Sequence, residues 1–292
     1  MTPPDEPAPT EIVRSPVTAA AIGLVSGGIS AFFGIGSGLV MAPALALFLR
    51  IRPARATGTS LAIVLPIAIT ALVRYQTAVV RTHPTGAGHL LTTFAGALSS
   101  AYPVSFAAVL LLALGSVVGA GLVRGRAAGN VRTGMGMLLV ILGAVLWRHP
   151  FWLPPAGVYD ITGSDSVKLL AAGCASGVVT SFLGAGGGVV LVPVLVLALG
   201  FPQYLAEATS LGVITVATLF GAVAHAARGN VIWSLAFPLA LGGMLAAWLV
   251  MGWALQVPEA LLRGAFGALL AAVGAGMGFS RARRQRVRSA EE

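Results

Sequence analysis

The sequence predicts an all-α integral membrane protein made of two inverted-topology repeats of about five helical segments each. Three observations lead to this prediction. The 292-residue chain is 57% hydrophobic and 9% charged, whereas roughly a quarter of the residues in soluble domains are charged. Two stretches that lie 150 positions apart resemble each other without a gap. Each copy contains a glycine-rich interruption of an apolar run, which predicts short or broken helices at these motifs.

The repeat is clearest between Ser26–Pro43 and Ser176–Pro193, and its register continues to Leu61 and Leu211. Fifteen of the thirty-six positions from Ser26 to Leu61 are identical in the second copy. An internal repeat determines how the whole fold is read. Because the period is far longer than that of a solenoid, each copy is half of the protein.

Five apolar runs make up the first half. A helix needs about 20 residues to cross the hydrocarbon core, and the third, fourth and fifth runs meet this length or nearly so. The second run has eleven residues and reaches only about 17 Å, so we expect a half-helix paired with the glycine-rich first run. The runs are Pro16–Phe33, Leu39–Leu49, Thr57–Tyr75, Val104–Val123 and Val131–Trp147.

The second half repeats this order, again with a short second run. Its runs are Ser166–Leu183, Val189–Leu199, Leu205–Ala227, Ile232–Met251 and Pro258–Phe279. The later runs match the first half at an offset of 127, because Leu241-Gly242-Gly243 aligns with Leu114-Gly115-Ser116. The first half therefore carries about 23 extra residues, at about 81–103, which we interpret as an outer loop with an amphipathic piece.

The basic residues predict the orientation in a cell inner membrane. With both termini in the cytoplasm, thirteen of the 18 Lys and Arg residues fall inside, as the positive-inside rule requires. Five segments per half is an odd number, so the second half enters from the opposite side and the repeats are inverted. The predicted units are a disordered cytoplasmic N-terminus 1–15, a first repeat 16–148, an extracytoplasmic linker 149–165, a second repeat 166–279 and a basic cytoplasmic tail 280–292.

The composition also limits the function. The net charge is +9, but five arginines lie in the tail and most others in short loops, so the expected partner is a lipid bilayer and not nucleic acid. Cys174 is the only cysteine, which excludes an intramolecular disulfide and the common metal-binding spacings. The sequence contains no Ser–His–Asp arrangement and no metal-ligand cluster. We therefore expect no catalysis, cofactor or metal.

The two glycine motifs have three possible interpretations. A dinucleotide loop requires a glycine where the chain has Leu39 and Val189, so it is excluded. Close helix packing is the simple alternative. A broken helix whose free N–H groups and positive dipole end face a substrate cavity suits an anion. The residues of the two motifs are Gly34, Gly36, Ser37, Gly38, Gly184, Gly186, Gly187 and Gly188.

Two further pairs of polar or helix-bending residues repeat near these motifs. Pro43 and Pro193 lie inside the short second runs, where proline removes a backbone hydrogen bond. Threonine-serine pairs stand near the start of the third runs, where their hydroxyls either cap a helix or donate to substrate oxygens. If the hydroxyls donate to substrate, the two prolines and the four hydroxyl residues all belong to the substrate site. The hydroxyl residues are Thr59, Ser60, Thr209 and Ser210.

Three ionisable residues are candidates for ion coupling or for the entrance of the site. Glu207 stands in the first turn of a predicted helix, where it either complements the helix dipole or couples ion movement to transport. Arg74 and His225 lie one position apart in the repeat register. They are either interfacial residues or attract an anion to the entrance.

The doubled motif resembles a known family. The pattern S-G-x-x-x-x-F-x-G-x-G-x-G-x-x-x-x-P occurs twice, each time followed by A-x-x-T-S-L, and it is similar to that of the sulfite exporter TauE/SafE family of membrane permeases. The resemblance extends from about Val17 to Phe279, although the insertion at 81–103 departs from the compact repeat. It implies a helical permease for sulfur oxyanions or organosulfonates such as sulfite or sulfoacetate.

The functional expectation is therefore a secondary transporter that moves a small anion by alternating access around the paired glycine breaks. Two alternatives remain open at this stage. One is a non-transporting scaffold or accessory subunit in which the glycines only pack helices. The other is a transporter of a different small solute, for which a metal cation is disfavoured by the expected absence of acidic residues in the core.

Overall fold

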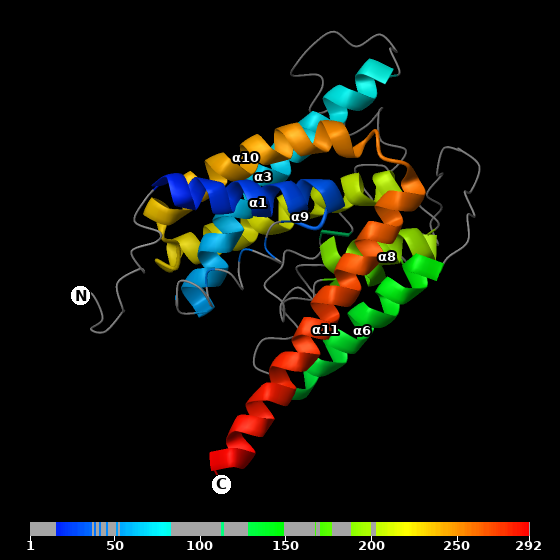
Figure 1. Ribbon diagram of the computed structural model, residues 1–292. Coiled ribbons are helices and arrows are strands. Elements are labelled where there is room, and N and C mark those ends of the chain that lie inside the picture. Colours follow the sequence, from blue (N-terminus) through cyan, green and yellow to red (C-terminus); the bar gives the residue numbers. More distant parts are fainter. Residues whose placement is uncertain are drawn as a thin grey trace.

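The computed structural model describes residues 16–36, 38, 41, 45, 51, 53–82, 112–113, 128–148, 167, 170–176, 188–199 and 203–291. Regular secondary structure in these ranges is helical throughout, as the sequence predicts. The helices are α1 Pro16–Phe33, α3 Pro53–Thr82, α6 Ala128–Arg148, α8 Gly188–Leu199, α9 Gln203–Ala227, α10 Trp233–Ala254 and α11 Glu259–Glu291 (Figure 1).

Four stretches of the described chain are long and apolar enough to cross a membrane. They are Ala54–Tyr75, Gln203–Ala227, Trp233–Ala254 and Glu259–Gly276. The outer faces are apolar too: Phe237, Leu245 and Leu249 of α10 are exposed, which a helix tolerates where lipid surrounds it. The chain is a multi-pass helical membrane protein.

Most helix bounds agree with the predicted segments, but α3 begins four residues before and ends seven residues after the predicted Thr57–Tyr75. Helix α1 begins and ends at the predicted residues, and α8 begins one residue before the predicted Val189. Helix α11 is the main difference, because its 33 residues span about 50 Å, well beyond the roughly 30 Å hydrocarbon core. The basic run at 281–288 continues this helix instead of forming a separate tail.

Several predicted segments lie outside the described residues. The predicted runs Leu39–Leu49 and Val104–Val123 are described only at residues 41, 45, 112 and 113. Residues 1–15, the insertion from residue 83 onward and the linker 149–165 are likewise not described. Their predicted roles stay predictions.

Helices α1 and α10 pack side by side in parallel (Figure 1). A β-carbon at Gly23 would overlap the carbonyl of Leu239, and one at Gly27 would overlap the backbone of Gly243. From the other side, a β-carbon at Gly242 would overlap the carbonyl of Ala20. Gly23 and Gly27 are four residues apart, the spacing by which small residues let membrane helices approach closely.

Helices α6 and α11 form a second close pair (Figure 1). A β-carbon at Gly143 would lie 2.5 Å from the carbonyl oxygen of Gly267, and one at Gly274 would overlap the carbonyl of Gly136. Early residues of α6 therefore meet late residues of α11, so the two helices run antiparallel.

Helices α3 and α9, which are equivalent in the repeat, also pack against each other in antiparallel fashion. Gly58 near the start of α3 contacts His225 near the end of α9, and Leu61 contacts Gly221. Val64 and Ile214, which are themselves repeat equivalents, both contact Gly36 near the middle of the two helices. Antiparallel packing of equivalent helices is what inverted repeats require.

The glycine contacts recur in both halves. Gly23 contacts the carbonyl of Leu239, and the same offsets of 150 and 127 relate this pair to Gly173 and the carbonyl of Leu112. An internal two-fold relation generates such matched contacts. They support the inverted arrangement, whose orientation in the membrane stays a prediction.

Candidate functional site

Helix α1 ends in a buried break. Phe33 is its last residue, and the next three residues leave the helix with φ +62° at Gly34 and φ +74° at Gly36. Side-chain-bearing L-residues rarely adopt this left-handed region, so glycine is needed at both positions. Ile35 between them is 1% exposed. Irregular backbone at membrane depth is tolerated only where protein or a cavity surrounds it.

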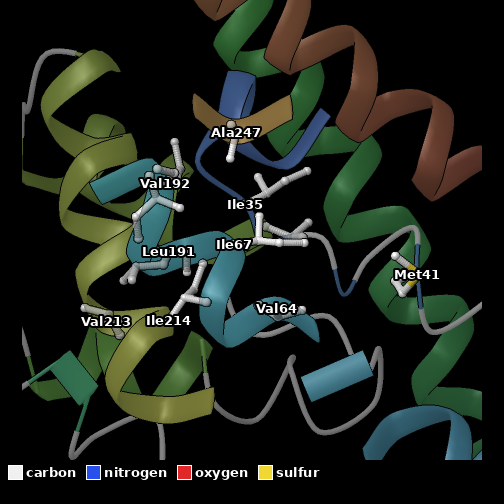
Figure 2. Close-up of a cluster of buried hydrophobic side chains, with 14 of the residues drawn as sticks. Ile35, Met41, Val64, Ile67, Leu191, Val192, Val213, Ile214 and Ala247 are labelled. Atoms are coloured by element: carbon white, nitrogen blue, oxygen red, sulfur yellow. The ribbon is translucent and has the colours of Figure 1, made fainter. Parts of the chain in front are cut away.

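The break lies against the middle of α3 and α9. A β-carbon at Gly36 would lie 3.3 Å from Cδ1 of Ile214 and 3.6 Å from Cγ1 of Val64. Figure 2 shows Ile35, Val64 and Ile214 within the buried apolar cluster that fills this part of the protein. The sequence motif therefore lies in the interior and not at the lipid surface.

The N-terminus of α8 meets the α1 break directly. Gly188 is the first residue of α8, and a β-carbon there would lie 2.7 Å from Cα of Ile35. The same position is 2.8 Å from Oγ of Ser210 on α9. We call this meeting point, made by residues 34–36, Gly188 and Ser210, the glycine junction. It joins the glycine motifs of the two halves, which the repeat led us to expect.

A buried hydroxyl lies at the glycine junction. Ser210, Ser60 of α3 and Thr209 of α9 are 0% exposed, and none of their hydroxyl oxygens has a hydrogen-bond partner among the described residues. Ser60 lies one turn before Val64, as Ser210 lies one turn before Ile214. A buried polar group without a partner costs about 1–3 kcal/mol, so the hydroxyl of Ser210 is available to a partner at the junction.

Thr59 differs from its repeat equivalent Thr209. Its Oγ1 accepts a hydrogen bond of 3.0 Å from the backbone N–H of Ile232, the residue that precedes α10. Thr59 therefore satisfies the N–H at the start of another helix, while its own O–H can still donate and its role in substrate binding stays a prediction.

Glu207 is buried beside the glycine junction, in the second turn of α9 and not in the first turn as the sequence predicts. It is 3% exposed, and its Oε1 accepts a hydrogen bond of 2.8 Å from Nε2 of Gln203. A β-carbon at Gly34 would lie 2.6 Å from Cβ of Glu207, so the carboxyl-bearing residue touches the first residue of the break.

Arg74 and His225 lie at opposite ends of the α3–α9 pair. The Nε of Arg74 donates a 3.2 Å hydrogen bond to the carbonyl of Trp248, and its guanidinium is 5.2 Å from the centre of the Trp248 ring. His225 packs near Gly58. Sixteen residues of α3 separate these contacts, about 24 Å along the helix, so the structure does not bring both side chains to one site.

The other predicted site residues divide into two groups. Gly38 and Pro193 are described and buried, with Pro193 inside α8. Five lie outside the described residues: Ser37, Pro43, Gly184, Gly186 and Gly187. Among the side chains that the structure does describe, no group of three or more His, Cys, Asp or Glu could hold a metal ion.

Sequence reasoning missed Gln203 and the helix-packing glycines of α10. Gln203 stands four residues before Glu207, the spacing at which helical side chains meet, and this signal could have identified the pair. Gly242 and Gly243 gave no comparable signal, because their close contacts are with residues more than 170 positions away.

The break after α1, buried where it meets the start of α8, defines a helical membrane protein with a helix interrupted in its interior. The model of the sulfite exporter TauE/SafE family matches residues 2–146 and 90–277. The chain belongs to this family of membrane transporters. It is also similar to the "Probable membrane transporter protein YunE" of Bacillus subtilis (strain 168), with 25% identity over 245 residues, which cover 77% of this chain and 84% of that protein.

Proposed function

We propose that this transporter moves a small anion, a sulfur oxyanion or organosulfonate such as sulfite or sulfoacetate, by alternating access around the glycine junction. The observation that carries the proposal is the glycine junction itself, where the start of α8 meets the α1 break beside the buried hydroxyl of Ser210. The description of the family as sulfite exporters supports the choice of a sulfur-containing anion.

The proposed anion site uses neutral donors. The first N–H groups of α8 have no partner within the helix, and a helix N-terminus carries a partial positive charge that favours an anion. The hydroxyls of Thr209 and Ser210 donate to oxyanion oxygens from α9, and that of Ser60 donates from α3. Glycine at positions 36 and 188 keeps side chains away from these donors.

The antiparallel α3–α9 pair supports the alternating-access part of the proposal. The site lies where equivalent helices of the two halves cross, near Val64 and Ile214. An inverted pair of repeats can rock about such a point, so that the site opens to one face and then to the other.

The orientation can be tested at equivalent positions of the two repeats. Ala54 and Tyr204 are exposed residues in the first turns of α3 and α9. We expect a membrane-impermeant maleimide added to intact cells to label Tyr204→Cys but not Ala54→Cys, each in a protein that also carries Cys174→Ala. Labelling of both from the same side contradicts the inverted repeats.

Flux measurements test the proposed function itself. Purified protein in liposomes should take up at least one of labelled sulfite, sulfoacetate, thiosulfate and taurine faster than protein-free liposomes. If correctly folded protein moves none of these solutes, the sulfur-anion proposal is wrong and a scaffold role or a different solute gains support.

A further inference from the structure

We propose that Glu207 carries a proton together with the anion, so that one proton crosses the membrane with each anion that passes the glycine junction. This inference rests on the proposed function, and it adds the coupling ion and the residue that binds it. The Glu207 carboxyl takes up the proton on the face where the anion enters and releases it to water on the other face. The O–H bond is the only bond made and broken.

The place of Glu207 gives the first argument. The residue lies inside the span Gln203–Ala227 and is 3% exposed, and ionisable residues inside membrane segments are costly and usually functional. Its neighbour Gly34 begins the α1 break. Ser210 follows Glu207 by three residues, so the two side chains leave the same face of α9 with Cβ atoms about 5–6 Å apart.

Two titratable side chains interact electrostatically with Glu207, namely Tyr75 of α3 and Glu259 of α11, and α1 presents Gly34. Helix α11 also carries the buried Arg263, one turn after Glu259. Glu259 lies near Glu207, because its Oε1 accepts a 3.0 Å hydrogen bond from the backbone N–H of Gln203. The negative charge of Glu259 opposes ionisation of Glu207, whereas a protonated Glu207 carries no charge.

Gln203 gives the second, independent argument. Its Nε2 donates to Oε1 of Glu207, while its own Oε1 is buried without a partner among the described residues. A carboxamide and a neutral carboxylic acid can form two hydrogen bonds, one in each direction. A proton on the second carboxyl oxygen of Glu207 supplies the donor that Oε1 of Gln203 lacks, and an ionised carboxylate cannot.

Repulsion then couples the proton to the anion. An anion held by Ser210 and the N-terminus of α8 lies about one helical turn from Glu207. At roughly 7 Å and an effective dielectric constant near 20, repulsion between two unit negative charges weakens binding about fifty-fold. The anion therefore binds when Glu207 is protonated, and proton and anion move in the same direction.

The test uses the full-length protein in liposomes that contain a pH-sensitive dye. The probes are sulfoacetate and thiosulfate, because both keep a constant charge between about pH 6 and pH 8 while sulfite does not. We expect inward anion gradients to acidify the interior of wild-type vesicles. Uptake should fall as the pH rises through the range in which Glu207 loses its proton, because apparent affinity follows the protonated fraction.

The Glu207→Gln protein should keep anion exchange, lose the acidification and vary less than about twofold over the same pH range. Glu259→Gln is the matched control and should acidify the interior as the wild type does. Acidification by Glu207→Gln at the wild-type ratio of protons to anions overturns the inference.

Wild-type anion uptake without proton movement also overturns the inference while leaving the proposed function intact. This measurement decides the matter even if Glu207→Gln does not insert. If the wild type takes up neither probe nor any other anion, the proposed function itself has failed.

Discussion

Replacing Gly36 with valine should abolish anion transport while the protein still inserts and folds. Gly36 has φ +74°, a conformation that a β-branched residue rarely adopts. Its β-carbon would already lie 3.3 Å from Ile214, and the methyl groups of valine extend further into the glycine junction. The side chain therefore displaces the break and covers the backbone amides. Uptake per folded protein in liposomes measures the effect.

Gly229 supplies a control that separates backbone strain from blockage. It has φ +68°, and a β-carbon there meets nothing within 4 Å. Gly229→Val should therefore lose some stability, about 1–2 kcal/mol from the left-handed backbone, and keep transport. By the repeat, Gly186→Val should act like Gly36→Val. Normal transport by Gly36→Val would show that the break only packs helices.

Replacing Gly27 with leucine should prevent correct packing of α1 on α10. Even a β-carbon at Gly27 would overlap the backbone of Gly243, and backbone cannot move aside as a flexible side chain can. Overpacking of this kind costs typically 1–3 kcal/mol and occasionally more, and here the helices themselves must separate. We expect a loss of most monodisperse protein after detergent extraction, measured by size-exclusion chromatography, and a lower unfolding temperature.

Gly28 on the same helix provides the matched control. A β-carbon there lies 3.6 Å from Cγ2 of Val250 and 3.8 Å from Cβ of Ala246, which is ordinary contact. Gly28→Ala should therefore give wild-type yield. Equal yields of Gly27→Leu and wild-type protein would mean that α1 and α10 do not pack as described.

The helices themselves were largely predictable, because the length of an apolar run identifies a membrane helix. This is why the bounds of α1 were predicted to the residue and those of α8, α9 and α10 within three residues. The length of α11 was not predictable in this way, since its last turns contain arginines and no longer follow the hydrophobic signal.

The packing partners were not predictable from local pattern. Gly23 and Gly27 mark a close contact by their spacing, but nothing in the sequence near them identifies α10 as the partner. The hydrogen bond from Ile232 to Thr59 joins residues 173 positions apart, and no local pattern near either residue indicates the other as its partner.

The candidate site was predictable where the repeat determined it. The two glycine motifs were expected to face each other because they occupy equivalent positions, and the structure places Gly188 of the second motif against Ile35 of the first; substrate binding there stays a prediction. The environment of Arg74 was not predictable from the repeat, because its guanidinium lies over the ring of Trp248 on another helix.

Protection of position 210 by anion tests the central claim most directly. Ser210→Cys, combined with Cys174→Ala, places a thiol at the glycine junction, and labelling by N-ethylmaleimide in liposomes reports its access. Sulfoacetate at about ten times its Kd should slow this labelling about tenfold, while Tyr204→Cys on the exposed face of α9 is labelled at an unchanged rate. If a transported anion leaves the labelling rate at Ser210→Cys unchanged, the anion does not bind at the glycine junction and the account is wrong.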